Sequence, residues 1–205
     1  MKDVQPPFLQ HYRINALRVA AAMGFGVMAV TAAPPPLPVL SPFLKMWGIT
    51  AIFIAIAGRA WVLLYIGGRK NSELVTDGPY SITRNPLYVF SLTGITGVGL
   101  LTGSLISMTA FVLCAYLAFE MAIRGEEAYL SSRYGHRFHA YRQAVPRFWP
   151  DFSLWRESDA LPLSSGRALE SLRDGVVFIL AWIGIELLKV GQRTGLVPVV
   201  LTLPF

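Results

Sequence analysis

Charged residues are scarce in this sequence. Only 15% of its 205 residues are Asp, Glu, Lys or Arg, whereas a soluble domain carries about 25%. With 54% hydrophobic residues, this composition excludes an ordinary soluble domain and indicates an integral membrane protein. The formal net charge is +6, but the basic residues lie between apolar runs and form no separate basic domain. We therefore exclude nucleic-acid binding and expect basic loops that face the cytoplasm.

Cysteines and clustered metal ligands are also lacking. Cys114 is the only cysteine, so no internal disulfide can form, and its place in an apolar run predicts a small packing residue. The histidines are scattered; His136 and His139 are three residues apart, but no third ligand is evident. We therefore predict no metal site. The sequence also has no Ser-His-Asp set with a recognisable elbow and no phosphate-binding glycine loop of the usual spacing.

What the sequence does contain is a series of apolar runs, which predict an all-α, polytopic transmembrane bundle of about five membrane helices. The runs cover residues 14–33, 43–66, 86–102, 105–123 and 176–190. A bilayer-spanning helix needs about 20 residues, so the last run is short and is compatible with spanning, re-entry or packing against the bundle. The first run has a basic leader and ends in small residues, so it also resembles a secretory signal peptide.

The segments between these runs predict the domain organisation. The proline-rich residues 34–38 predict a stiff turn outside the bilayer, and residues 102–104 predict a tight turn that makes a hairpin of the third and fourth runs. Over residues 124–147, basic and aromatic residues recur at helical spacing, which predicts a cytoplasmic amphipathic helix on the membrane surface. We expect a membrane core at residues 1–150, followed by a connection and an additional hydrophobic helix at 151–205.

The distribution of basic residues predicts the orientation. Arginines and lysines are frequent at the N-terminus, after the second run and after the fourth, whereas the connections after the first and third runs carry only Lys45. Because basic loops stay in the cytoplasm, we expect residues 78–88 and 126–150 to face the cytoplasm together. They can therefore build one site.

The loop at residues 77–88 reads Asp-Gly-Pro-Tyr-Ser-Ile-Thr-Arg-Asn-Pro-Leu-Tyr. Gly78-Pro79 predicts a turn, and Pro86 is well placed as the first residue of the next helix, where its missing N–H costs nothing. A helix N-terminus beside Arg84 favours an anionic group such as a carboxylate. The alternative is a simple polar loop with a basic anchor.

Other polar residues are candidates for function. Arg59 lies about two turns before the C-terminal end of the second run, where a charge is either functional or reaches the interface beside Trp61 and Tyr65. Glu126 and Glu127 are adjacent, so they point to different helix faces; their alternative role is to place negative charge in the first turn of the surface helix.

Three motifs follow one another between about residues 58 and 150. The first is Leu74-Val75-Thr76-Asp77-Gly78-Pro79-Tyr80, then Arg84-Asn85-Pro86-Leu87-Tyr88; the second is Gly97-Val98-Gly99. The third is Glu126-Glu127 with Leu130, then Tyr134-Gly135, Tyr141 and Val145-Pro146-Arg147-Phe148. In this order they resemble the integral membrane methyltransferase family that includes isoprenylcysteine carboxyl methyltransferases and phospholipid N-methyltransferases, with its G-P-Y, R-H-P-x-Y-x-G, E-E-x-x-L and V-P-R-F motifs.

The resemblance implies S-adenosylmethionine as methyl donor and a lipid-like acceptor that enters from the bilayer. The residues implied to contact the cofactor are Asn85, Pro86, Leu87, Tyr88, Gly97, Gly99, Glu126 and Glu127. Arg84 is implied to orient the acceptor, and Glu126 to do polar work beside it. Arg59, because of its charge inside an apolar run, is a further candidate for contact with the acceptor. An isoprenylcysteine-type carboxylate is the first choice of acceptor, because a carboxylate needs an arginine clamp and no strong base. A phospholipid amine is the second choice, because an amine must first lose a proton.

Two positions depart from the family pattern. Asn85 stands where the family usually has histidine, and it cannot titrate near neutral pH. Phe90 stands where the family usually has glycine, and it adds bulk. These departures favour, as an alternative, a non-catalytic membrane protein that keeps the scaffold. A membrane reductase with a nicotinamide cofactor is a third interpretation. For the glycines Gly97 and Gly99, close helix packing is an alternative to ligand contact.

Overall fold

The computed structural model describes residues 31–32, 40–66, 73–157, 165–199 and 201–202. Its helices are α2 (Leu40–Ile66), α3 (Pro79–Ile82), α4 (Pro86–Leu101), α5 (Leu105–Tyr134), α6 (His136–Ala144), the short 3-10 helix η1 (Phe152–Leu154) and α7 (Ser165–Arg193). Two strands of two residues, β1 (Thr31–Ala32) and β2 (Leu201–Thr202), pair in parallel. The prediction of an all-α membrane bundle is confirmed.

Among the described residues, three helices are long and apolar enough to cross a bilayer. These spans are Pro42–Ile66, Leu105–Tyr134 and Gly175–Arg193. α4 is apolar but has only 16 residues, and its length of about 24 Å is less than the roughly 30 Å of a hydrocarbon core. The predicted run at 14–33, with its signal-peptide alternative, and the turn at 34–38 lie outside the described residues, apart from Thr31–Ala32 in β1.

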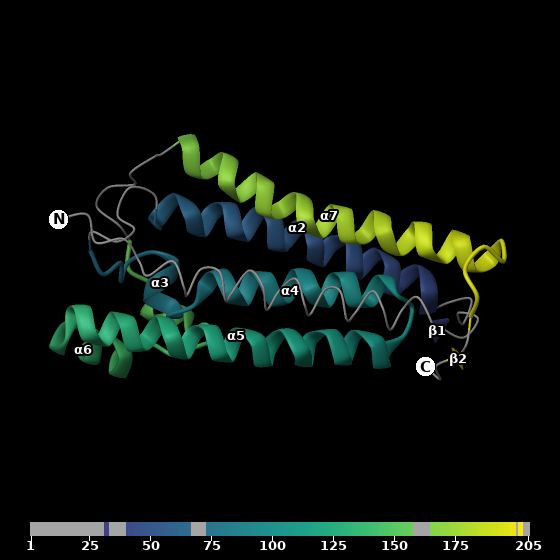
Figure 1. Cartoon of the computed structure of the whole chain (residues 1–205). Coiled ribbons are helices and arrows are strands. Elements are labelled where there is room, and N and C mark those ends of the chain that lie inside the picture. The colour runs from purple at the N-terminus through teal and green to yellow at the C-terminus, as the bar shows by residue number, and fades with distance from the viewer. Residues whose placement is uncertain (1–30, 33–39, 67–72, 158–164, 200, 203–205) are drawn as a thin grey trace.

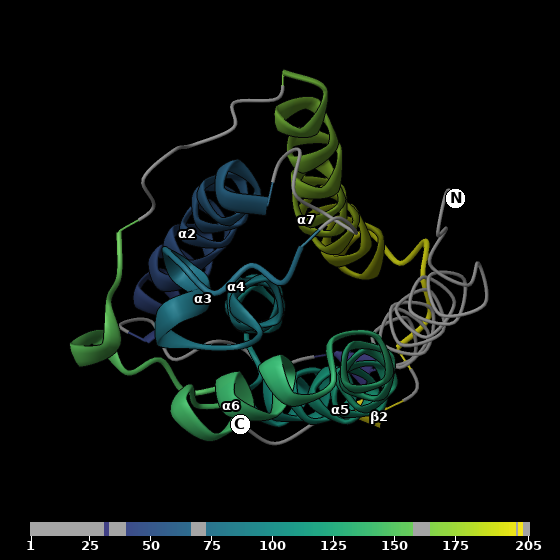
Figure 2. The ribbon, with the colours of Figure 1, turned by 90° about the vertical axis from the view of Figure 1, so that its left-hand side faces the viewer.

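α4 lies in the middle of the bundle and contacts α2, α5 and α7 (Figures 1 and 2). The chain runs up and down, so the C-terminal ends of α2 and α5 and the N-terminal ends of α4 and α7 meet at one end of the bundle (left in Figure 1). We call this end, with residues 73–86 and 134–157, the polar end. It carries α3, α6 and η1. The prediction that residues 78–88 and 126–150 lie on the same side is confirmed.

Glycines let α4 approach its neighbours closely. A Cβ atom on Gly97 would lie 2.6 Å from the carbonyl oxygen of Gly48 on α2. A Cβ atom on Gly99 would lie 2.8 Å from the Cα atom of Met108 on α5. Such distances leave no room for a side chain, so both glycines act as small residues at helix interfaces. Apolar side chains of α2, α4 and α7 complete this part of the core: Ile52, Val98, Leu101 and Ile185.

The predicted helix boundary at Arg124 is wrong. α5 continues without a break as far as Tyr134, and the expected surface helix is divided between the end of α5 and α6. The chain first turns at Gly135, whose φ of 50° is a conformation that favours glycine. Polar composition alone does not stop a helix, since the residues after Arg124 include good helix formers. Glu126 and Glu127 therefore lie inside a long helix and not in a first turn.

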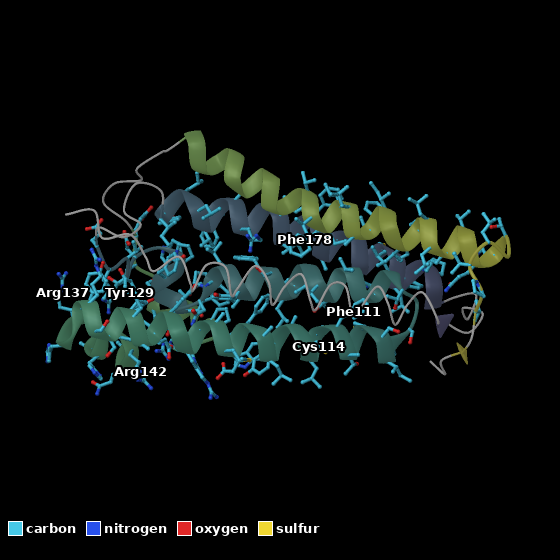
Figure 3. All side chains as sticks on the ribbon, viewed as in Figure 1. Phe111, Cys114, Tyr129, Arg137, Arg142 and Phe178 are labelled. Atoms are coloured by element: carbon cyan, nitrogen blue, oxygen red, sulfur yellow. The ribbon has the colours of Figure 1, made fainter. Side chains whose placement is uncertain are left out.

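The fifth apolar run is part of α7, which is longer than the run itself and packs against α2 and α4. Phe178, labelled in Figure 3, fills the space beside Gly94 of α4, where a Cβ atom would lie 2.6 Å from its ring. Near the other end of α7, Glu186 pairs with Lys45 of α2 at 3.2 Å.

Cys114 does not have the predicted packing role. Its side chain is exposed on α5, among other exposed apolar residues such as Leu113 and Leu117. In a membrane-spanning helix, an exposed apolar face is the face that suits lipid.

Candidate functional site

The predicted turn at Gly78-Pro79 is confirmed, and two contacts fix it. Gly78 has a φ of 56°, and a Cβ atom on it would lie 2.2 Å from the ring of Tyr65 on α2. Its N–H donates a hydrogen bond of 2.7 Å to the carbonyl oxygen of Arg156. Pro79 then begins α3. The turn is therefore held between the end of α2 and the segment that follows α6.

The N-terminus of α4 is tied to residues 146–148. Pro86 is the first residue of the helix, as predicted. Asn85 occupies the N-cap position, but its side chain makes no cap; its Nδ2 donates instead to the carbonyl oxygen of Arg147 at 2.8 Å. The backbone N–H of Arg84 donates to the carbonyl oxygen of Pro146 at 2.9 Å. The first and third motifs of the sequence are thereby joined.

Four charged side chains meet beside this junction. Arg84 Nη1 lies 2.8 Å from Glu127 Oε1, and Arg147 Nε lies 3.3 Å from the same oxygen. Arg147 Nη1 also lies 2.6 Å from Glu120 Oε1. The side chains of Arg84 and Glu127 are only 10% and 14% exposed. We call these residues, Arg84, Glu120, Glu127 and Arg147, the charge cluster.

The charge cluster is paired in charge but incomplete in hydrogen bonding. Arg84 Nε and Nη1, Glu127 Oε1 and Arg147 Nε are buried without a hydrogen bond of good geometry within the described residues. Burial lowers the pKa of the Arg84 guanidinium, and the nearby carboxylate of Glu127 partly offsets this effect. Three of these atoms, Arg84 Nη1, Glu127 Oε1 and Arg147 Nε, are nevertheless paired in charge with one another, so the hydrogen bonding of the cluster is incomplete chiefly at Arg84 Nε.

Glu120 and Arg147 were not predicted as site residues. Glu120 was counted as part of the apolar run 105–123, although a carboxylate inside a predicted span is itself a sign of function. Arg147 was identified only as part of the Val145–Phe148 motif. Its contact with the cluster depends on the tertiary fold, so the local sequence does not reveal it. The same Oε1 atom of Glu120 also lies 3.3 Å from Nη2 of Arg124, whose side chain is 73% exposed.

Glu126 has a different partner from Glu127, as the prediction of different faces required. The hydroxyl of Tyr88 donates to Glu126 Oε1 at 3.0 Å. Tyr88 is buried and packs on Phe119 of α5, with 5.0 Å between ring centroids. The hydrogen bond from Tyr88 thus connects the first turn of α4 with a carboxylate of α5. The neighbouring residue Leu87 is half-buried.

Tyr141 closes the polar end against α3. Its hydroxyl donates to the carbonyl oxygen of Tyr80 at 2.7 Å. Burial raises the pKa of the Tyr141 hydroxyl above its ordinary range, so this group stays a neutral donor.

Arg59 comes from α2 and not from the α4–α5 junction. It turns toward α4, where its Nη1 donates to Ser91 Oγ. Phe90 fills the space beside Gly58 of α2, since a Cβ atom there would lie 2.2 Å from the Phe90 ring. Trp61 stands edge-on to Phe90. The described contacts thus place Arg59 at the α2–α4 interface and Tyr88 with Glu126 at the α4–α5 interface.

Gly97 and Gly99 are also separate from the charge cluster. They lie about three turns along α4 from Pro86, at the helix contacts with Gly48 and Met108. The predicted site residues thus fall into three groups: those at the α4–α5 junction, Arg59 at the α2–α4 interface, and the two packed glycines.

Comparisons with known proteins give partial and full-length matches. The family model described as phospholipid methyltransferase matches residues 37–137. The cobalt-zinc-cadmium resistance protein CzcN of Cupriavidus metallidurans is 33% identical over 196 residues, which cover 96% of this chain and 90% of the relative. The nickel-cobalt-cadmium resistance protein NccN of Alcaligenes xylosoxydans xylosoxydans is 32% identical over 197 residues, or 96% and 92% of the two chains.

A shorter match is to an enzyme. The protein-S-isoprenylcysteine O-methyltransferase of Schizosaccharomyces pombe is 36% identical over 83 residues, which cover 40% of this chain and 35% of that protein. No solved structure matches the chain significantly.

Proposed function

The chain belongs to the integral membrane methyltransferase family that includes isoprenylcysteine and phospholipid methyltransferases, and we propose that it transfers a methyl group from S-adenosylmethionine to a lipid-like acceptor. Our first choice of acceptor is the carboxylate of an isoprenylcysteine-type compound, and the alternative is a phospholipid amine. The observation that carries the proposal is the junction of α4 and α5, where Tyr88 meets Glu126 beside the charge cluster.

The residues at this junction fit the charge of the cofactor. When bound, S-adenosylmethionine supplies a methyl group on a positively charged sulfur, and it also carries an ammonium group. The carboxylates of Glu120 and Glu127 pair with the guanidiniums of Arg84 and Arg147. A third carboxylate, that of Glu126, accepts from the Tyr88 hydroxyl. We assign Glu126 to the positive groups of the cofactor, because its hydrogen bond with Tyr88 holds a carboxylate against the first turn of α4.

The first turn of α4 forms the rest of the assigned cofactor site. We assign cofactor contacts to Asn85, Pro86, Leu87, Tyr88 and Glu127 at the α4–α5 junction. Gly97 and Gly99 contribute to this site, in our proposal, by holding α4 close to α2 and α5. Such positioning matters because methyl transfer depends mainly on alignment and on exclusion of water.

Arg84 is our candidate for orienting the acceptor. Its Nη1 atom is paired with Glu127, whereas its Nε atom is buried without a hydrogen bond within the described residues, so an acceptor carboxylate would complete the Nε donor. A carboxylate is already nucleophilic through its oxygen lone pairs, so the protein has no proton to remove. For an amine acceptor, the carboxylate of Glu126 is the group placed to accept the proton. Arg59, on α2, is a weaker candidate for contact with the acceptor, because it already donates to Ser91.

The position of the site suits an acceptor that stays in the membrane. α4 begins at the polar end, where the longer helices α2 and α5 end (Figure 1). Its N-terminus therefore lies within reach of lipid headgroups when these longer helices span the bilayer. The polar end carries many of the arginines of the chain, which supports a cytoplasmic orientation. The names of the two full-length relatives suggest that the methyl transfer serves resistance to metal ions.

Binding and turnover on the purified protein test the proposal. Calorimetry with S-adenosylmethionine and with its demethylated product should detect binding of both. Activity is then screened over prenylcysteines, phosphatidylethanolamine and small hydrophobic acids, with methylation expected for a prenylcysteine carboxylate. If neither cofactor form binds, the protein is not a methyltransferase; if both bind and only phosphatidylethanolamine is methylated, the alternative acceptor is correct.

A further inference from the structure

A cleft of about 420 Å³ opens at the polar end, away from the proposed methyl-transfer site. Its lining residues come from α6, from the stretch before and within α3, and from η1 and the segment after it: Leu74, Thr76, Ser81, His136, Arg137, Ala140, Tyr141, Ala144, Val145, Leu154 and Arg156. This volume lies in the range of about 300–1,000 Å³ that is typical of ligand sites. None of the residues assigned to the cofactor or acceptor lines it.

The cleft combines an apolar floor with a basic rim. Leu74, Val145 and Leu154 provide apolar surface, whereas Arg137 and Arg156 are exposed and basic. No carboxylate lines the cleft. Within the described residues, neither of these two guanidiniums takes part in an ion pair, so both are available to an anion.

The two arginines are held in place by different elements. Arg137 lies in the first turn of α6 and is labelled at the polar end in Figure 3. Arg156 is fixed through its backbone, since its N–H donates to Ser81 Oγ at 3.0 Å and its carbonyl accepts from Gly78. The rim is therefore attached to the fold at both sides, and its spacing does not depend on a free loop.

We propose that this cleft binds the phosphate headgroup of an anionic phospholipid. Arginine guanidiniums bind phosphate oxygens with paired hydrogen bonds, and the apolar floor suits the glycerol and the first methylene groups. The location supports a lipid. α5 has 30 residues, or about 45 Å, so its end and α6 extend past a roughly 30 Å hydrocarbon core into the headgroup region. The negative charge of anionic lipids attracts arginine and lysine side chains that lie in the headgroup region.

The chemistry of the cleft argues against the methyl donor as its ligand. S-adenosylmethionine carries a sulfonium, an ammonium and one carboxylate, so its net charge is positive, and a site with two arginines and no carboxylate leaves its positive groups without a partner. Glu73 and Asp77 flank the cleft in sequence but do not line it. The lipid site is thus additional to the proposed function and can be measured without methyl transfer.

Native mass spectrometry of the full-length protein in neutral detergent tests the inference. Phosphatidylglycerol should bind at least about tenfold more tightly than phosphatidylcholine, and Arg137→Gln should weaken its binding by about tenfold, the effect of one lost charged hydrogen bond. Arg142→Gln is the matched control, because Arg142 is exposed on the same helix but does not line the cleft. It should change the affinity by less than about twofold.

A second pair of variants tests the volume of the cleft without changing charge. Ala140→Leu places bulk in the cleft and should weaken phosphatidylglycerol binding, whereas Gln143→Leu on the same helix should not. Equal binding of both lipids, or equal effects of Arg137→Gln and Arg142→Gln, would overturn the inference. Displacement of the lipid by equimolar inorganic phosphate would also overturn it, because the apolar floor would then contribute nothing.

Discussion

The two sides of α4 contact their neighbouring helices in different ways. Toward α2, glycines bring the backbones together, as at Gly97 and Gly48. Toward α5, near its N-terminus, α4 meets carboxylates instead, through Tyr88 and Glu126. The comparison shows that one helix can pack closely through glycines on one face and present polar side chains on the other.

The helical period makes this division possible. Ser91 and Gly94 point toward α2 and α7, whereas Tyr88, Leu92 and Ile95 pack in the cluster with α5. Two arginines beside α4 follow the same division. Arg59 meets a hydroxyl, whereas Arg84 meets a carboxylate. We therefore expect chemistry on the α5 side and mechanical support on the α2 side.

Glu127→Ala should have the largest effect. It leaves the buried guanidinium of Arg84 without its carboxylate, and loss of one partner of a buried ion pair costs about 3–5 kcal/mol of folding stability. Cofactor binding or turnover should also fall strongly, as measured by calorimetry and by methyl-transfer assays. Glu157→Ala, at an exposed site, is the control. Wild-type stability and turnover in Glu127→Ala would contradict the role of the charge cluster.

The comparison of Arg84→Gln with Arg59→Gln should separate the two sides directly. Arg84→Gln should lower turnover by about 100-fold, or roughly 2.7 kcal/mol, with a much smaller change in cofactor affinity. Arg59→Gln should lower turnover by less than about tenfold, because Arg59 donates to the hydroxyl of Ser91 and not to the charge cluster. If Arg84→Gln instead impairs mainly cofactor binding, Arg84 belongs to the donor site.

Gly97→Leu should damage folding rather than chemistry. The new side chain would meet the backbone of Gly48, and overpacking of this kind costs about 1–3 kcal/mol. The yield of monodisperse protein and its thermal unfolding temperature should fall, whereas Ala110→Leu, at an exposed position of α5, should leave both unchanged. A Gly97→Leu protein that folds normally but no longer binds cofactor would show that Gly97 contacts the cofactor, as the family resemblance implies.

The parts of the fold that could be predicted from sequence are those that local chemistry imposes. Gly78-Pro79 and Pro86 restrict the backbone wherever they occur, so the turn and the start of α4 were correct. The end of α5 was not predicted, because the change to polar residues at Arg124 alters the surroundings of a helix without breaking it. Arg147 enters the site through a loop after α6, and such a contact between distant segments has no local signal.

Tyr88→Phe should have the smallest effect and is the sharpest test of the α5 side. It removes only the hydroxyl that donates to Glu126 Oε1 at 3.0 Å, so the ring packing on Phe119 remains. Loss of one hydrogen bond to a charged group costs about 1.5–3 kcal/mol, and we expect cofactor affinity to fall by about tenfold. The effect arises because Glu126 loses the donor that fixes its orientation. Tyr116→Phe, in a tyrosine that packs on Phe148 from an exposed position, should leave affinity unchanged; equal effects of the two variants would mean that Glu126 is not oriented for the cofactor.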